Sequence, residues 1–154
     1  MIRSAAVLFL FCVAICSFSA VSAYEANRAV RIAILGGGGR SQHLLLECLK
    51  INKDIKVVAI CDENGLAAHN FFCEKLKAQH QISTCTALQA CFKDTAVYPD
   101  TEDGLQQFCR NHSGVDWIFI TSSNYRHQAH LTSVLEYSPV KNRNTIEYGS
   151  YSYV

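Results

Sequence analysis

The chain has 154 residues, of which 49% are hydrophobic, and it carries 14 Lys and Arg against 13 Asp and Glu. This length and apolar content suit one globular domain with a core of its own. The near-neutral balance of charges excludes the strongly basic surface that nucleic-acid binding requires. The sequence also lacks a basic amphipathic segment of the kind that predicts binding to a membrane surface.

Residues 1–23 have the three parts of a secretory signal peptide. A short positive start contains Arg3, an apolar run extends from Ala5 to Cys16, and small residues precede Tyr24. They predict cleavage after Ala23 and a location in the secretory pathway or outside the cell. A signal anchor is the alternative, but the apolar run is shorter than the ~18 residues of a spanning helix. Residues 24–154 then hold 13 basic and 13 acidic residues, and we expect no membrane contact after cleavage.

The segment 31–41, Arg-Ile-Ala-Ile-Leu-Gly-Gly-Gly-Gly-Arg-Ser, joins an apolar run to four glycines. The run predicts a buried strand, and a helix is expected to open near Gln42. Glycines let the backbone turn sharply, and the helix offers its unpaired N–H groups to a pyrophosphate. This arrangement is typical of nucleotide-binding sheets.

A second apolar run, residues 56–61, ends on Asp62, which lies 26 residues after Gly36. This interval somewhat exceeds the usual one of about 20 residues between the glycine motif and the ribose-binding acid. A carboxylate there accepts hydrogen bonds from ribose hydroxyls and repels a 2′-phosphate, which favours NAD over NADP. The alternative is that Asp62 only caps the turn at Asn64-Gly65.

Amphipathic helical segments alternate with short apolar runs along the rest of the chain. Residues 67–79 predict a second helix, and residues 96–98 and 116–121 predict further strands. Such alternation favours an α/β fold, a Rossmann-like doubly wound parallel sheet. The helical stripes are predicted to be core packing; they are Leu45, Cys48 and Leu49, then Ala68, Phe72 and Leu76, then Leu105, Phe108 and Cys109.

The strand predicted at 116–121 ends on hydroxyl residues and an Asn at a helix start. Open α/β sheets bind ligands at the carboxyl ends of their strands. Ser123 or Asn124 can instead cap the helix, and capping and ligand contact can coexist. His127 and His130 lie three residues apart on this helix, but without a third ligand nearby we predict no metal site.

Taken in order, the four segments 31–43, 56–62, 97–105 and 115–127 resemble the N-terminal domain of the glucose-fructose oxidoreductase/inositol dehydrogenase (Gfo/Idh/MocA) family. The resemblance covers about residues 30–137 and implies a Rossmann domain that binds NAD or NADP. Ser41 stands where many members keep a third glycine, and Ser122 replaces or displaces a usual proline. The cofactor-binding residues implied are Gly36, Gly38, Gly39, Arg40, Ser41, Asp62, Thr121, Ser122, Ser123, Asn124 and His127.

The chain departs from the family pattern after Tyr137. Family members continue into a fifth strand, a Glu-Lys-Pro motif with a catalytic lysine, and a second α/β domain that holds the substrate. Residues 138–154 contain no such motif and no sustained apolar run, so we expect an irregular tail after a single domain at 24–137. A truncated gene model or a natural short product would both explain this ending.

Two classes of function remain open. The first is the nicotinamide-dinucleotide-binding part of an oxidoreductase acting on sugars or polyols, catalytically incomplete in this chain. Its missing lysine and substrate pocket would come from a second chain or a C-terminal domain, and His127 is the one titratable group expected near the nicotinamide. The alternative is a secreted, non-catalytic binding or regulatory protein on a Rossmann scaffold.

Six cysteines follow residue 23, and none forms a Cys-x-x-Cys pair, which makes zinc and thioredoxin-type chemistry unexpected. Most are predicted to be small apolar core residues. Residues 81–94 are interpreted as an insertion before the third strand. In an oxidising compartment, Cys85 and Cys91 within it are therefore the best candidates for a disulfide.

Overall fold

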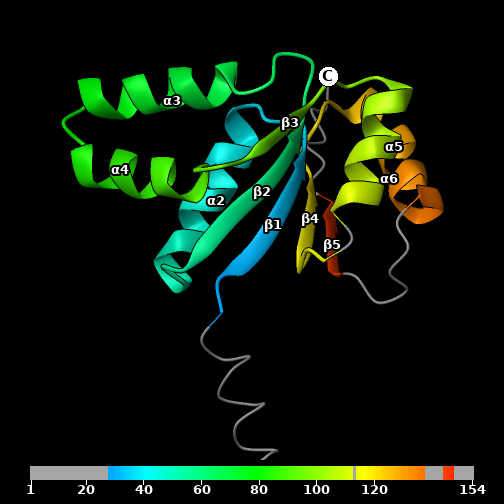
Figure 1. Ribbon diagram of the computed structural model, residues 1–154. Helices are drawn as coiled ribbons and strands as arrows, with labels where there is room; N and C mark the ends of the chain where they lie inside the picture. The colour runs from blue at the N-terminus through cyan, green and yellow to red at the C-terminus, as the bar shows by residue number, and fades with distance from the viewer. Residues whose placement is uncertain (1–27, 113, 138–143, 148–154) are drawn as a thin grey trace, which may run out of the picture.

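The computed structural model describes residues 28–112, 114–137 and 144–147 (Figure 1). The predicted signal peptide, residues 1–23, lies outside this part of the chain. Strands and helices alternate through the described residues, and helices cover both faces of one parallel sheet. The predicted α/β, Rossmann-like fold is therefore confirmed.

The sheet has five parallel strands in the order β3-β2-β1-β4-β5. From β1 the chain proceeds outward through β2 to β3, and it then returns to place β4 on the other side of β1. The sheet is thus doubly wound, with its switch point between β1 and β4. The strands are β1 (Val30–Leu35), β2 (Ile55–Cys61), β3 (Ala96–Tyr98), β4 (Trp117–Ile120) and β5 (Asn144–Glu147).

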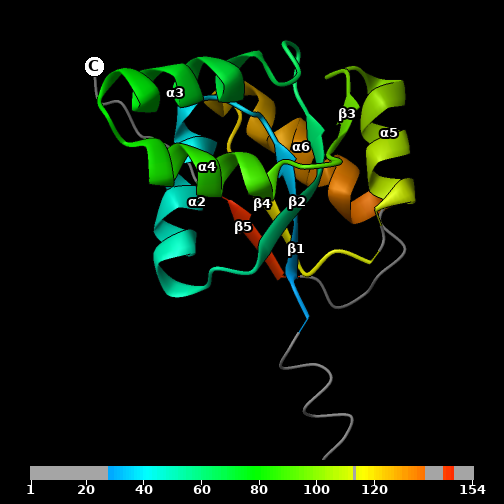
Figure 2. The same cartoon turned by 60° about the vertical axis from the view of Figure 1, so that its left-hand side comes forward.

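The helices form two layers, one on each face of the sheet. Figure 1 shows α2, α3 and α4 on one side of the strands and α5 and α6 on the other, and the turned view in Figure 2 preserves this division. The first layer consists of α2 (Gly39–Ile51), α3 (Ala67–Ala78) and α4 (Ile82–Cys91), and the second of α5 (Glu102–Asn111) and α6 (Asn124–Tyr137).

Strand β1 is buried on both faces from Ile32 to Leu35, which explains the apolar sequence of these four residues. Ile32 and Ile34 belong to the core under α2, α3 and α4, whereas Ala33 and Leu35 belong to the core under α5 and α6. All four side chains are at most 2% exposed. Alternation along a strand thus divides apolar residues between two cores, as expected for a parallel sheet covered by helices.

The interpretation of residues 81–94 as an insertion is wrong. They contain helix α4, in which Cys85, Leu88 and Cys91 are buried against the sheet side of the layer. Their spacing of three residues is a helical stripe, and two of its three members are cysteines acting as small apolar residues.

The expectation that Cys85 and Cys91 are the best candidates for a disulfide is wrong for the same reason, and both thiols are free. Six residues along a helix correspond to a rise of roughly 9 Å. The Cα atoms of a disulfide are usually about 4.4–6.8 Å apart, so one helix cannot hold this bond.

The expectation of an irregular tail is also wrong in part, because residues 144–147 form strand β5. Its backbone pairs in parallel with β4, from Trp117 opposite Asn144 to Ile120 opposite Glu147. The ladder joins backbone groups, so a polar sequence at a sheet edge does not prevent it. The remaining tail, residues 138–143 and 148–154, lies outside the described residues. No helix among the residues searched is both long and apolar enough to cross a membrane.

Candidate functional site

A hollow of about 550 Å³ lies at the carboxyl ends of β1 and β4, which is the switch point of the sheet. Open α/β sheets place ligands at this point because the loops diverge there to opposite faces. The glycine loop after β1 forms one wall, and the loop from β4 to α6 forms the other. The lining residues are Gly38, Gly39, Arg40, Thr121, Ser122, Ser123, Asn124 and Tyr125.

Seven of the eleven residues predicted to bind a cofactor line this hollow together. Tyr125 is an additional lining residue and is 81% exposed. Gly36, Ser41, Asp62 and His127 do not line it, and each instead contacts one of the two loops that do. Seven predicted residues thus line the hollow, and the other four hold the loops that form it.

Gly36 brings the two loops into contact. Its φ of +91° is a conformation that glycine adopts easily, and a Cβ atom there would lie 2.4 Å from the Cα of Ser122. Next to this contact, the Thr121 hydroxyl donates to the Gly36 carbonyl at 2.6 Å. The close approach and this hydrogen bond connect the carboxyl end of β1 to the carboxyl end of β4.

Gly38 and Gly39 face open space. A Cβ atom built on either glycine would meet no heavy atom within 4 Å. Gly38 is the N-cap of α2, and the Ser41 hydroxyl donates back to its carbonyl at 2.7 Å. The first turn of a helix presents N–H groups without partners inside the helix, and here this turn borders the hollow.

Asp62 follows β2 and supports the glycine loop from the side. Its Oδ2 accepts a hydrogen bond from the Gly37 N–H at 2.8 Å, and its Oδ1 accepts one from the Asn64 N–H at 2.8 Å. The second bond is the turn-capping contact weighed as the alternative in the sequence. The first bond links the acid directly to the glycine loop, and the ribose-binding role of Asp62 stays a prediction.

A buried chain of hydrogen bonds also supports the glycine loop. The fully buried Gln42 amide donates to the Gly37 carbonyl at 3.2 Å, and its Oε1 accepts from Nδ1 of His69 at 3.0 Å. Burial lowers the pKa of His69 below its ordinary value, which favours the neutral ring. Sequence analysis missed this pair, because a Gln and a His in separate helices carry no joint pattern.

His127 lies behind the β4–α6 loop and is 7% exposed. Its Nε2 donates to the carbonyl of Ser122 at 2.7 Å. This nitrogen therefore holds the backbone of the loop, and His127 is absent from the residues that line the hollow.

A second histidine, His130, connects the hollow to a partly buried acid, Asp100. The Ser122 hydroxyl lies 2.8 Å from Nδ1 of His130, and Nε2 of His130 lies 2.9 Å from Oδ1 of Asp100. Arg126 forms an ion pair with the same carboxylate. Burial alone raises the pKa of Asp100, but hydrogen bonds from Arg126 and His130 bring it below its ordinary value. Sequence analysis considered His130 only as a metal ligand and missed Asp100.

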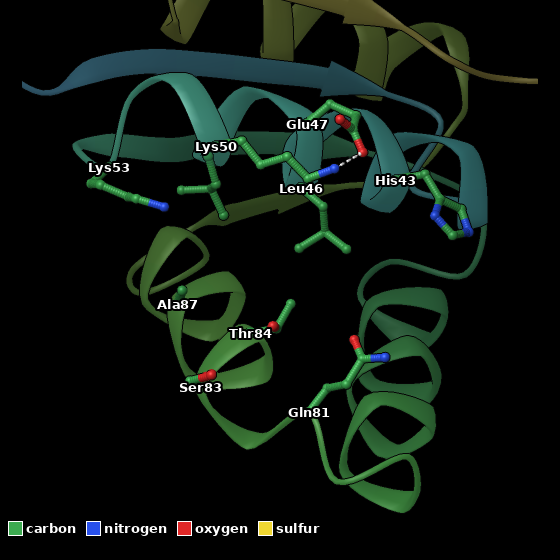
Figure 3. Close-up of a pocket in the computed structure, with 10 residues that line it drawn as sticks. His43, Leu46, Glu47, Lys50, Lys53, Gln81, Ser83, Thr84 and Ala87 are labelled. Carbon is green, nitrogen blue, oxygen red and sulfur yellow. Dashed lines mark hydrogen bonds and ion pairs between the residues drawn. The ribbon is translucent and has the colours of Figure 1, made fainter.

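Another hollow, of about 460 Å³, lies between α2 and α4 (Figure 3). Leu46 and Thr84 point toward one another across it, and Lys50 pairs with Glu47 of its own helix at 2.6 Å. Its walls are the outer surfaces of helices rather than strand ends. The N-cap Gln81 and the first turn of α4 border it, but none of its lining residues is a glycine or belongs to a loop after a strand.

Within the described residues, no group of three or more His, Cys, Asp or Glu side chains is arranged to hold a metal ion. Comparison with models of known protein families finds no match, and comparison with curated proteins finds no significant one.

Proposed function

We propose that this domain binds a nicotinamide dinucleotide, with NAD preferred over NADP, across the hollow at the ends of β1 and β4. One observation carries the proposal: Gly38 and Gly39 face open space at the N-terminus of α2, at the switch point of a doubly wound sheet. A pyrophosphate needs close approach to backbone N–H groups, and a side chain at either glycine would obstruct it.

The surrounding residues suit the rest of such a ligand. Asp62 keeps acceptor capacity after its two backbone hydrogen bonds, because each carboxylate oxygen has two lone pairs. It is the group proposed to accept from the adenosine ribose hydroxyls. The loop of residues 121–124, on the β4 side, is proposed to face the nicotinamide half.

When bound, the dinucleotide would supply hydride-transfer chemistry. The residues of this chain would bind and orient it: the glycine loop at the phosphates, Asp62 at the ribose, and the hydroxyls of Ser122 and Ser123 beside the nicotinamide. In the resemblance to the Gfo/Idh/MocA family, the substrate is a sugar or polyol. We propose that the substrate pocket and the proton-transferring lysine come from a second chain or a further domain.

The second candidate function is binding without turnover. It is favoured by the placement of His127, whose Nε2 donates to a backbone carbonyl and so holds the loop. A general base must reach the proton that it removes, directly or through one water. On this alternative the protein is a secreted binding or regulatory protein that uses the same hollow.

Titration of the purified chain with NADH, followed by nicotinamide fluorescence, tests the proposal. Gly38→Val should abolish binding while leaving the fold intact, because its side chain enters open space. Ala87→Val is the control, since it introduces the same valine side chain at the hollow between α2 and α4 (Figure 3). Equal affinity of wild type and Gly38→Val, or loss of binding in Ala87→Val alone, would refute the assignment.

A further inference from the structure

The hydrogen-bond chain from Ser122 to Asp100 has an order known from hydrolases. A serine hydroxyl lies within hydrogen-bond distance of one ring nitrogen of His130, and the other ring nitrogen lies within reach of a carboxylate. In a Ser-His-Asp triad the histidine takes the serine proton, and the acid fixes the tautomer of the ring. Here Nδ1 faces the serine and Nε2 the acid, so the ring is turned while the roles are kept.

The tautomer of His130 follows from the negative charge of Asp100. An ionised Asp100 only accepts hydrogen bonds, so Nε2 of His130 must donate to it. In the neutral ring, Nδ1 is then the acceptor, and the Ser122 hydroxyl must donate its proton to Nδ1. The Ser122 hydroxyl is the donor in this bond, so the lone pairs of its oxygen remain available for attack on a carbonyl carbon.

Ser122 also has the position that a nucleophile requires. It lies in the short turn between β4 and α6 and lines the hollow of about 550 Å³. Gly38 and Gly39, at the start of α2, line the same hollow. Peptide N–H groups at the start of a helix are suited to stabilising a developing oxyanion.

We propose that Ser122 is the nucleophile of a hydrolytic site for small carboxylic esters, with His130 as its general base. The Ser122 oxygen bonds to the ester carbonyl carbon as its proton passes to Nδ1 of His130. The bond from that carbon to the alkoxy oxygen then breaks, and the alcohol leaves with the proton. Water then gives a proton to Nδ1 of His130 and attacks the acyl carbon. The bond from that carbon to the Ser122 oxygen breaks as the proton passes from His130 to this oxygen, and the acid is released.

Asp100 is a positioning residue in this site. Its ion pair with Arg126 offsets part of its negative charge, so the carboxylate stabilises positive charge on the His130 ring in the transition state less than an unpaired acid would. Cys61 also lies near Asp100, and its thiol stays uncharged because burial raises its pKa to about 12. We therefore expect activated esters, such as p-nitrophenyl acetate, rather than amides to be cleaved.

Labelling with a fluorophosphonate tests the nucleophile directly. The Ser122 oxygen would bond to phosphorus, fluoride would leave, and the serine proton would pass to His130. Peptide mass spectrometry should locate the label on Ser122, and Ser122→Ala should remove it. Ser83→Ala is the matched control, because Ser83 lines the separate hollow between α2 and α4, and it should leave labelling unchanged. Absence of label, or label on Ser123, would overturn the proposal.

Two further variants separate the base from the scaffold. His130→Gln should slow labelling and p-nitrophenyl acetate hydrolysis by about 10²- to 10⁴-fold, the usual contribution of a general base. Its circular dichroism is measured alongside, and an undiminished rate in the folded variant would contradict the role. Asp100→Asn, which keeps an acceptor but removes the charge, should lower kcat for p-nitrophenyl acetate and leave KM unchanged, because Asp100 contacts His130 and not the substrate. An unchanged kcat in the folded variant would exclude a positioning role for Asp100.

This inference does not depend on dinucleotide binding. NADH should slow labelling if the two ligands share the hollow. Labelling that NADH leaves unchanged would count against the proposed dinucleotide site and not against the nucleophile.

Discussion

The Asp62 carboxylate accepts a hydrogen bond from the Gly37 N–H at 2.8 Å, which joins the end of β2 to the glycine loop after β1. The acid proposed to bind the ribose hydroxyls therefore also supports the glycine loop. This dual role decides what a substitution at Asp62 should do.

Asp62→Ser should weaken NADH binding by about tenfold, because a charge-assisted hydrogen bond contributes about 1.5 kcal/mol or more. NADPH binding should change less, since removal of the carboxylate also removes its repulsion of the 2′-phosphate. The preference for NAD should therefore narrow. Fluorescence titration with both dinucleotides measures it, and Glu63→Ser, which removes the neighbouring exposed acid, is the control. A wild-type chain that already prefers NADPH would show that Asp62 only caps the turn.

Substitution by alanine should affect stability strongly at one glycine of the loop and hardly at another. Gly36→Ala should lower the free energy of unfolding by about 1–3 kcal/mol, because it forces a side chain into a left-handed conformation and against the Ser122 backbone. Gly38→Ala should change it by less than about 0.5 kcal/mol, since a Cβ there meets no atom. Urea unfolding followed by the fluorescence of Trp117 measures both. Equal losses of unfolding free energy in the two variants would contradict the conformation described for this loop.

Stability should fall when the pH drops below about 6.5, the ordinary pKa of histidine. The buried ring of His69 has a lowered pKa, so the unfolded chain binds its proton more readily than the folded one. Its contribution is present above the unfolded pKa and is lost as the pH falls through that of the folded state. Thermal unfolding between pH 7.5 and pH 5 measures the effect, and His69→Gln should reduce the slope. An unchanged slope in a folded His69→Gln variant would assign the dependence to other groups.

The thiols of the folded chain should react slowly with iodoacetamide. Burial raises the pKa of Cys48 and Cys91, that of Cys61 to about 12, and, together with a hydrogen bond to Cys85, that of Cys73 to about 11. Thiolates are the reactive form, so alkylation should require local opening. Cys48 is the one half-buried thiol among the described cysteines and should be modified first. Peptide mass spectrometry follows the order, and early modification of Cys61 would contradict the burial.

The sequence alone determined the fold class and most of the candidate site. Apolar runs, helical stripes and glycines act within a few residues of one another, so their spacing reports on local structure directly. This is why the strand from Val30, its four glycines and the serines after β4 were predicted to lie at one edge of a sheet, and seven of the predicted residues line one hollow.

Only the tertiary structure decided how the residues behind the site are connected. Gln42 meets His69, and Ser122 meets Asp100 through His130, across helices and loops that are far apart in the chain. A buried polar side chain takes whichever partner the packing brings near, and no spacing along the sequence encodes that choice. The same holds for β5, whose pairing depends on backbone groups that every residue carries, and for the buried cysteines of α4, whose core role emerges only when the helix packs.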